Sequence, residues 1–196
     1  MGRMENPSPP LPACPVLTVP GLWNSGPEHW QSHWERLFPS VFRRVDQREW
    51  EKPALDDWIG SLEAAVGEAG PGVVLAAHSL GCALVGHWAA RRTPAGARVQ
   101  GALLVAPSDV EAPSYPAGPT GFAPMPLERL PFPSVVVASE DDTYVTPERA
   151  RAFAAAWGSR LVLLRGHGHL NSASRMGSWP LGLELLRELS LGKVPG

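Results

Sequence analysis

Ser79 has the sequence surroundings that most clearly indicate chemistry. The apolar run Val73–Ala77 leads into His78-Ser79-Leu80-Gly81, and an apolar helical stretch follows. A strand, a sharp turn that carries serine, and a helix form the layout of a nucleophile elbow. Gly81 lets the strand and the helix pass close together, and Ala77 stands where a glycine is usual. The alternative is that Ser79 only caps the helix that follows.

A serine hydroxyl is a weak nucleophile that needs a general base, and the base needs a carboxylate to orient it. In sheets with such an elbow, the chain order is Ser, then Asp or Glu, then His. The strand-like segment 134–139 runs into Glu140-Asp141-Asp142, and the strand-like segment 160–164 runs into a loop with two histidines. The carboxyl ends of parallel strands share one edge of a sheet, so these clusters can converge with Ser79.

Each cluster offers two candidates. Asp142 is favoured by the Asp-x-x-Val spacing that follows it, whereas Asp141 can be a turn residue or a negative charge near a helix N-terminus. His169, in Gly-His-Leu-Asn, is favoured as the base over His167, which we expect to be a loop residue. The predicted catalytic residues are therefore Ser79, His169 and Asp142.

Acyl transfer also requires two backbone N–H groups that face the developing oxyanion. One normally comes from the residue after the nucleophile, here Leu80, and the other from the loop after the first central strand. Gly21 allows a tight turn in that loop, and Leu22 is the second candidate donor. The alternative is a plain strand-to-helix loop in which Pro27 starts the helix.

Four sequence blocks resemble the α/β-hydrolase superfamily: Pro20–Gln31, His78–Gly81, Ser139–Asp142 and Gly168–Asn171. From about Pro15 onward, the chain is similar to the small, cap-less branch of retinoblastoma-binding-protein-nine and YdeN-like serine hydrolases. The resemblance implies a Ser–His–Asp triad, which falls on the three predicted residues. It also implies hydrolysis of small carboxylic esters or related acyl compounds, and we expect no cofactor.

Composition favours one globular domain. The chain has 196 residues, of which 44% are hydrophobic, and we assign residues 15–196 to a single domain. A net charge of −2 indicates neither a nucleic-acid partner nor a membrane surface. Cys14 and Cys82 are expected to be free thiols in a reduced compartment. Residues 1–14 are proline-rich and lack the apolar stretch of a signal peptide, so we expect a disordered arm and a cytoplasmic protein.

Strand-like and helix-like segments alternate along the chain. Strands are predicted near 15–20, 41–46, 72–78, 100–106, 133–139 and 160–165, and helices near 27–38, 54–68, 80–92, 147–157 and 180–190. This alternation predicts a three-layer α/β/α sandwich with a six-stranded parallel sheet and no lid domain. The resemblance implies strand order 2-1-3-4-5-6. In the first helix, Trp30, Trp34 and Leu37 are expected to form one buried face.

The segment Pro107–Pro131 lies where larger relatives insert a lid. Its prolines predict an ordered loop with room for one helical turn, which leaves an open site. Candidate aromatic residues of the acyl pocket are Trp23, Trp50, Phe122 and Trp179. Each of the four is also suited to packing in the core or on the surface.

Three other functions are compatible with parts of the sequence. His29 and His33 have the spacing of zinc ligands, but Trp30 stands where a glutamate should follow the first histidine, and no third ligand is evident, so we expect no metal. A protein-binding module on the same fold is the main alternative, although no binding motif is evident. Acyl transfer to an acceptor other than water would use the same catalytic residues.

Overall fold

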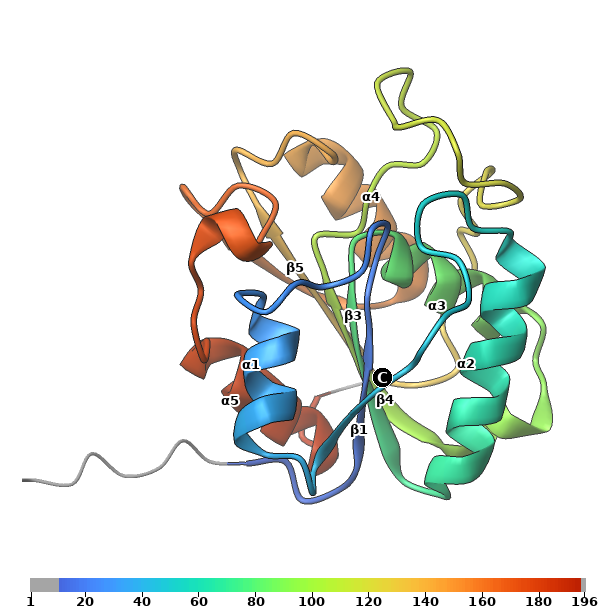
Figure 1. Ribbon diagram of the computed structural model, residues 1–196, viewed down its shortest axis with the longest axis vertical. Coiled ribbons are helices and arrows are strands. Elements are labelled where there is room, and N and C mark those ends of the chain that lie inside the picture. The colour runs from blue at the N-terminus through green and yellow to red at the C-terminus, as the bar shows by residue number, and fades with distance from the viewer. Residues whose placement is uncertain (1–10, 195–196) are drawn as a thin grey trace, which may run out of the picture.

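A computed structural model describes residues 11–194 and contains one parallel sheet of six strands (Figure 1). The strands follow the order β2-β1-β3-β4-β5-β6. Both the parallel sheet and its order confirm the predicted fold class. The strands are β1 (Val16–Val19), β2 (Phe42–Arg44), β3 (Val73–His78), β4 (Val99–Val105), β5 (Ser134–Ser139) and β6 (Arg160–Leu164).

Five α-helices cover the two faces of the sheet. They are α1 (Trp30–Leu37), α2 (Leu55–Ala69), α3 (Leu80–Ala90), α4 (Pro147–Trp157) and α5 (Pro180–Ser190). Helices α1 and α5 pack on one face, and α2, α3 and α4 pack on the other (Figure 1). Short 3-10 helices span Pro94–Arg98 and Ser172–Ser174.

Strand β3 lies in the middle of the sheet and is buried on both faces. Leu75 and Ala77 face the core under α2, α3 and α4, whereas Val74 and Ala76 face the core under α1 and α5. This explains why its sequence is a continuous apolar run rather than an alternating one. The strand therefore delivers Ser79 to a fixed point at the centre of the carboxyl edge.

Helix α1 buries its tryptophans as predicted but not its last leucine. Trp30 and Trp34 are fully buried, and the Trp34 ring stacks on Trp179 with centroids 5.9 Å apart. Leu37 is 51% exposed, so the prediction of a third buried position was wrong. The helix ends at Leu37, and the chain then turns toward β2, so that the next residue, Phe38, packs against the core instead.

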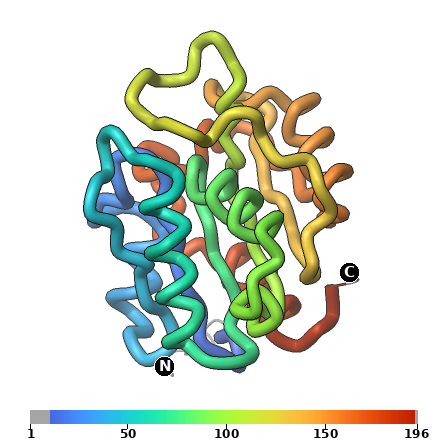
Figure 2. Tube along the Cα trace, turned by 90° about the vertical axis from the view of Figure 1, so that its right-hand side faces the viewer, coloured from blue at the N-terminus to red at the C-terminus, as the bar shows by residue number. Residues whose placement is uncertain are grey.

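Residues 107–131 form an ordered loop that runs across the top of the α2, α3 and α4 layer (Figure 2). The Leu55 amide donates to Thr120 O at 3.0 Å, His87 Nε2 donates to Phe122 O at 2.8 Å, and Trp157 Nε1 donates to Pro126 O at 2.8 Å. The structure describes every residue of this loop and shows no helix in it, only two hydrogen-bonded turns in which the Ala112 amide donates to Asp109 O and the Tyr115 amide donates to Ala112 O. Its prolines and these three anchors hold the loop in irregular conformation.

The predicted disordered arm falls mostly outside the described residues, but its last residues are described and ordered. The Leu11 and Cys14 side chains pack against the core under α1 and α5, and the Ala13 amide donates to Ser190 Oγ at 3.2 Å. The boundary predicted at Cys14 is therefore corrected, because these two side chains find apolar partners. Across residues 11–194, no helix is both long and apolar enough to cross a membrane.

At Gly81, helix α3 passes close to the end of β1, and we expect Gly81→Ala to be strongly destabilising. A Cβ atom there would lie 2.7 Å from Pro20 O and would also overlap Val19 O, and neither backbone oxygen can move cheaply. We expect a loss of about 3 kcal/mol in the free energy of unfolding, measured with urea. Gly60→Ala in α2 is the matched control, since its Cβ would meet nothing within 4 Å and should stabilise by about 0.5–1 kcal/mol. Equal midpoints for Gly81→Ala and wild type would contradict this account of the crossing.

Candidate active site

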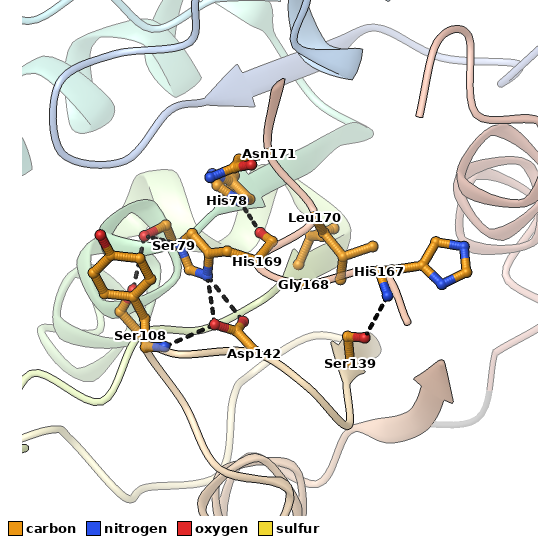
Figure 3. A network of polar contacts seen from close by, with 12 residues as sticks. His78, Ser79, Ser108, Ser139, Asp142, His167, Gly168, His169, Leu170 and Asn171 are labelled. Atoms are coloured by element: carbon orange, nitrogen blue, oxygen red, sulfur yellow. Dashed lines mark hydrogen bonds and ion pairs between the residues drawn. The ribbon is translucent and has the colours of Figure 1, made fainter. Parts of the chain in front are cut away.

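Ser79, His169 and Asp142 meet at the carboxyl edge of the sheet. Ser79 follows β3 directly, and Asp142 and His169 lie in the loops after β5 and β6. His169 Nε2 lies 2.9 Å from Ser79 Oγ, and His169 Nδ1 lies 2.9 and 3.0 Å from the two Asp142 carboxylate oxygens (Figure 3). The Asp142 side chain is fully buried, so its hydrogen bonds to the His169 ring are shielded from water.

The Ser79 backbone has the conformation of a sharp strand-to-helix turn. Its φ is 56° and its ψ is −123°, a region that side-chain-bearing residues rarely adopt. The Ser79 amide donates to Val105 O at 2.9 Å, which ties the turn to β4. Ala77 is fully buried, so its methyl group is accommodated in the core rather than at the turn.

Asp141 lies next to Asp142, but its carboxylate accepts hydrogen bonds from the surrounding loop rather than from the His169 imidazole. Asp141 Oδ1 accepts hydrogen bonds from Ser139 Oγ at 2.6 Å and from the amides of His167 and Gly168 at 3.1 Å each. The Ser139 hydroxyl, helped by the Gly168 amide, lowers the pKa of Asp141. His167 Nδ1 donates to Arg165 O at 2.7 Å, so its ring is engaged away from Ser79. Asp141 thus shapes the turn that presents His169.

The two candidate oxyanion donors lie on adjoining segments. A Cβ atom on Gly21 would lie 2.8 Å from Ser79 Cβ and 3.0 Å from the Leu80 amide nitrogen, so the loop with Leu22 passes directly over the elbow. Leu80 is the first residue of α3, where backbone N–H groups have no partner within the helix. No hydrogen bond from either the Leu22 or the Leu80 amide is found in the described part of the chain. Both amides are therefore free to bind an anionic oxygen.

A cavity of about 340 Å³ opens beside these residues. Two predicted residues line it: Leu22, the candidate oxyanion donor, and Trp23, one of the candidate pocket aromatics. Trp23 is 56% exposed. The cavity is lined by Leu22, Trp23, Asn24, His29, His78, Ser79, Ser108, Tyr115, Pro116, Tyr144, His169, Asn171, Ser172 and Ala173.

The other three predicted pocket aromatics lie outside this cavity, which corrects their assignment. Trp50 and Phe122 both pack on Trp58, with ring centroids 5.5 and 5.6 Å away. Trp179 is buried against Trp30 and Trp34. Each ring finds apolar partners under the helices, and burial there is more favourable than exposure at the site.

Several cavity residues were not predicted from the sequence. Ser108 lies shortly after β4 and Tyr144 shortly after β5, at the same sheet edge as Asp142. The rule that found Asp142, polar residues after the carboxyl end of a strand, could also have found Ser108. Tyr115 lies in the long loop 107–131, whose irregular path no sequence pattern indicates.

Two buried histidines, His78 and His29, lie near His169. The His78 ring lies 4.9 Å from the His169 ring, and His78 Nε2 donates to His169 O at 2.9 Å. Burial lowers the pKa of His78 well below its usual value. Burial, with the nearby Arg44 charge, lowers the pKa of His29 to about 3. Both rings are therefore neutral near pH 7, and His78 supports the backbone that carries His169.

The two histidines considered as zinc ligands have separate roles. His29 caps α1, because its Nδ1 accepts a hydrogen bond from the Gln31 amide at 3.2 Å. His33 Nδ1 lies 2.9 Å from a guanidinium nitrogen of Arg36. Residues 11–194 contain no group of three His, Cys, Asp or Glu side chains that could hold a metal ion.

The low pKa of His29 predicts that the protein loses stability in acid. The His29 pKa is about 3 in the folded chain, against an ordinary histidine pKa of 6.5, so between these values the unfolded chain binds a proton that the folded chain does not. The contribution is complete above pH 6.5 and is lost as pH falls toward 3, by about 1.4 kcal/mol per pH unit.

His29→Asn keeps a side-chain acceptor at the N-cap and removes this titration. Free energies of unfolding, measured with urea from pH 7 to pH 4, should therefore fall less steeply in His29→Asn than in the wild type. Parallel curves for the two proteins would show that His29 is not the buried neutral group inferred here.

Comparisons with known proteins show what the whole chain is similar to. A family model described as serine hydrolase matches residues 16–188. The chain is similar to the crystal structure of a YdeN-like hydrolase from Pectobacterium atrosepticum, with 32% identity, a TM-score of 0.79 and 93% of each chain covered.

Two more distant structures share the fold. The ydeN gene product from B. subtilis has 18% identity and a TM-score of 0.67, with 90% of this chain and 98% of that chain covered. A monoacylglycerol lipase from Paleococcus ferrophilus has 13% identity and a TM-score of 0.66, with 91% of this chain and 96% of that chain covered. No curated protein sequence matches the chain.

Proposed function

Since the chain belongs to the serine hydrolase family, we propose that it hydrolyses small carboxylic esters through an acyl-enzyme on Ser79. The observation that carries this proposal is the unbroken hydrogen-bonded path from Ser79 Oγ through the His169 ring to the Asp142 carboxylate. Nucleophile, base and orienting group thus have the mutual geometry that acyl transfer requires.

In the acylation step, Ser79 Oγ attacks the ester carbonyl carbon while its proton passes to His169 Nε2. The carbonyl π electrons move to the oxygen, and the Leu22 and Leu80 amides bind this oxyanion. Asp142 accepts the Nδ1–H bond, which fixes the imidazole tautomer and stabilises the imidazolium. When the tetrahedral intermediate collapses, the C–O bond to the alcohol breaks and His169 protonates the leaving alkoxide.

Deacylation repeats these steps with water as the nucleophile. His169 Nε2 takes a proton from water as the water oxygen attacks the acyl carbon, and the collapse returns the Ser79 oxygen. The proton on His169 goes back to Ser79 Oγ, and the carboxylic acid leaves. No cofactor enters either step.

The cavity favours a small substrate with an apolar acyl group. Its volume of about 340 Å³ is near the lower end of ligand pockets, and Leu22, Trp23, Tyr115 and Tyr144 supply apolar and aromatic walls. The proposed partner is therefore a small-molecule ester.

The test is a series of p-nitrophenyl esters from acetate to octanoate, with initial rates for wild type and Ser79→Ala. We expect turnover in the wild type only, highest for short acyl chains. A folded wild type that turns over none of the esters would refute the proposal and would favour the alternative, a protein-binding module. Product that forms faster when an alcohol is added would instead indicate transfer to an acceptor other than water.

A further inference from the structure

The Ser108 hydroxyl lies against the nucleophile, on a side that His169 does not occupy. The Ser108 and Ser79 Oγ atoms are 2.7 Å apart, and Ser108 is fully buried while also lining the cavity (Figure 3). None of the steps proposed above uses Ser108. We propose that Ser108 is a positioning residue that orients the attacking lone pair of Ser79, an inference that rests on the proposed function.

The direction of the bond follows from the groups around it. His169 Nδ1 lies against the Asp142 carboxylate and must donate to it, so Nε2, which takes the Ser79 proton in the proposed mechanism, is the acceptor. Ser79 therefore donates its only hydroxyl proton to His169. With that proton committed, Ser108 must be the donor and Ser79 Oγ the acceptor in the bond between the two hydroxyls.

This assignment fixes the orientation of the nucleophile. A hydroxyl oxygen has four roughly tetrahedral directions, namely its carbon, its proton and two lone pairs. At Ser79 Oγ the carbon takes one, the proton bound for His169 takes the second, and the Ser108 hydroxyl takes the third. A single lone pair remains to attack a carbonyl carbon, and its direction is set before substrate binds.

Ser108 is held firmly enough for this role. On its amino side, the Ala106 amide donates to Val137 O at 2.7 Å, and on its carboxyl side, the Asp109 amide donates to Tyr144 O at 2.9 Å. The Asp109 carboxylate also accepts two hydrogen bonds from Arg149, at 2.7 and 2.9 Å. These bonds fix the backbone on both sides of Ser108, so its hydroxyl can impose an orientation on Ser79.

The role applies to both halves of the reaction. In acylation, the Ser108 hydroxyl orients Ser79 Oγ and stabilises the negative charge that develops as the proton leaves. In deacylation, Ser79 Oγ is the leaving group, and the same donor stabilises it as the acyl C–O bond breaks. Ser108 does not contact His169 Nε2 or the two amides proposed for the oxyanion, so its removal should act on rates rather than on substrate binding.

The experiment compares Ser108→Ala with Ser134→Ala. Ser134 Oγ and Ser159 Oγ are 2.6 Å apart and Ser134 is fully buried, but this pair lies at the opposite end of the sheet. Ser134→Ala therefore removes the same kind of hydroxyl pair without touching the site. Burst kinetics with p-nitrophenyl acetate give the acylation and deacylation rate constants, and a fluorophosphonate gives an inactivation rate that does not depend on deacylation.

We expect Ser108→Ala to lower all three rates by about tenfold, the effect of about 1.4 kcal/mol, with KM changed by less than about twofold. Ser134→Ala should match the wild type. Thermal unfolding checks that both variants fold, and if Ser108→Ala does not, Ser108→Cys takes its place, with reduced rates expected because a thiol is a weak donor.

Rates for Ser108→Ala equal to wild type, or a raised KM at unchanged kcat, would overturn the positioning role while leaving the proposed function intact. A wild type that gives neither a burst nor inactivation would overturn both. The two failures are therefore distinguishable in one set of measurements.

Discussion

Ser79→Ala is expected to lower kcat for ester hydrolysis by about 10⁶-fold, and His169→Ala by a similar amount. The two residues act as one unit, because Ser79 attacks only as His169 takes its proton across the 2.9 Å hydrogen bond. Either change removes the whole acyl-enzyme route and leaves only what substrate binding and the oxyanion donors supply. Steady-state kinetics on one short-chain ester, with folding checked by circular dichroism, measure the loss.

The double variant sharpens this prediction. Either single change already removes the acyl-enzyme route, so Ser79→Ala combined with His169→Ala should be no slower than either single variant. A His169→Ala protein that retains activity within tenfold of wild type would place the base elsewhere. Additive losses in the double variant would show that the two side chains do not act together.

The second large effect is expected for Asp142, whose replacement by alanine should lower kcat by about 10⁴-fold. Its carboxylate holds the His169 Nδ1–H and is fully buried, and Asp142 Oδ1 also accepts from the Tyr144 amide at 2.8 Å. Asp142→Asn should be nearly as damaging, because an amide nitrogen facing Nδ1 favours the wrong imidazole tautomer. KM should change little in either variant, since Asp142 does not line the cavity.

Asp141 provides the matched control for Asp142. Asp141→Ala removes the acceptor for the His167 and Gly168 amides, so we expect a looser loop and a loss in kcat of about tenfold. Asp141→Asn, which keeps an acceptor oxygen, should restore part of that loss. If Asp141→Ala proved more damaging than Asp142→Ala, the assignment of the orienting carboxylate would be reversed.

The sequence predicted the elements well where local patterns and burial agree. The strand predicted near 72–78 and the helix predicted near 180–190 matched the observed bounds of β3 and α5 within two residues. The position after a strand indicated the cluster Glu140–Asp142, and the Asp-x-x-Val spacing then favoured Asp142 over Asp141. Leu37 was misassigned because helical periodicity does not show that Leu37 is the last residue of the helix, after which Phe38 packs against the core instead.

Pocket residues were harder to predict than catalytic ones. A tryptophan suits a core and a cavity wall equally, so composition could not separate Trp23, which lines the cavity, from Trp179, which packs under α1. Ser108 could have been found from its place just after β4, whereas Tyr115 depends on the path of the loop 107–131, which is set by contacts to three helices that are distant in sequence. The cytoplasmic location and the lack of nucleic-acid or membrane partners stay predictions from composition.

The central claim is that Ser79 is the nucleophile, and the most direct measurement is to locate a fluorophosphonate adduct by mass spectrometry. We predict one adduct per chain, on the peptide that contains Ser79, with no adduct on Ser79→Ala. The Ser108→Ala protein should label at the same residue, only more slowly. An adduct on another residue, or a folded wild type that remains unlabelled, would contradict the assignment of Ser79.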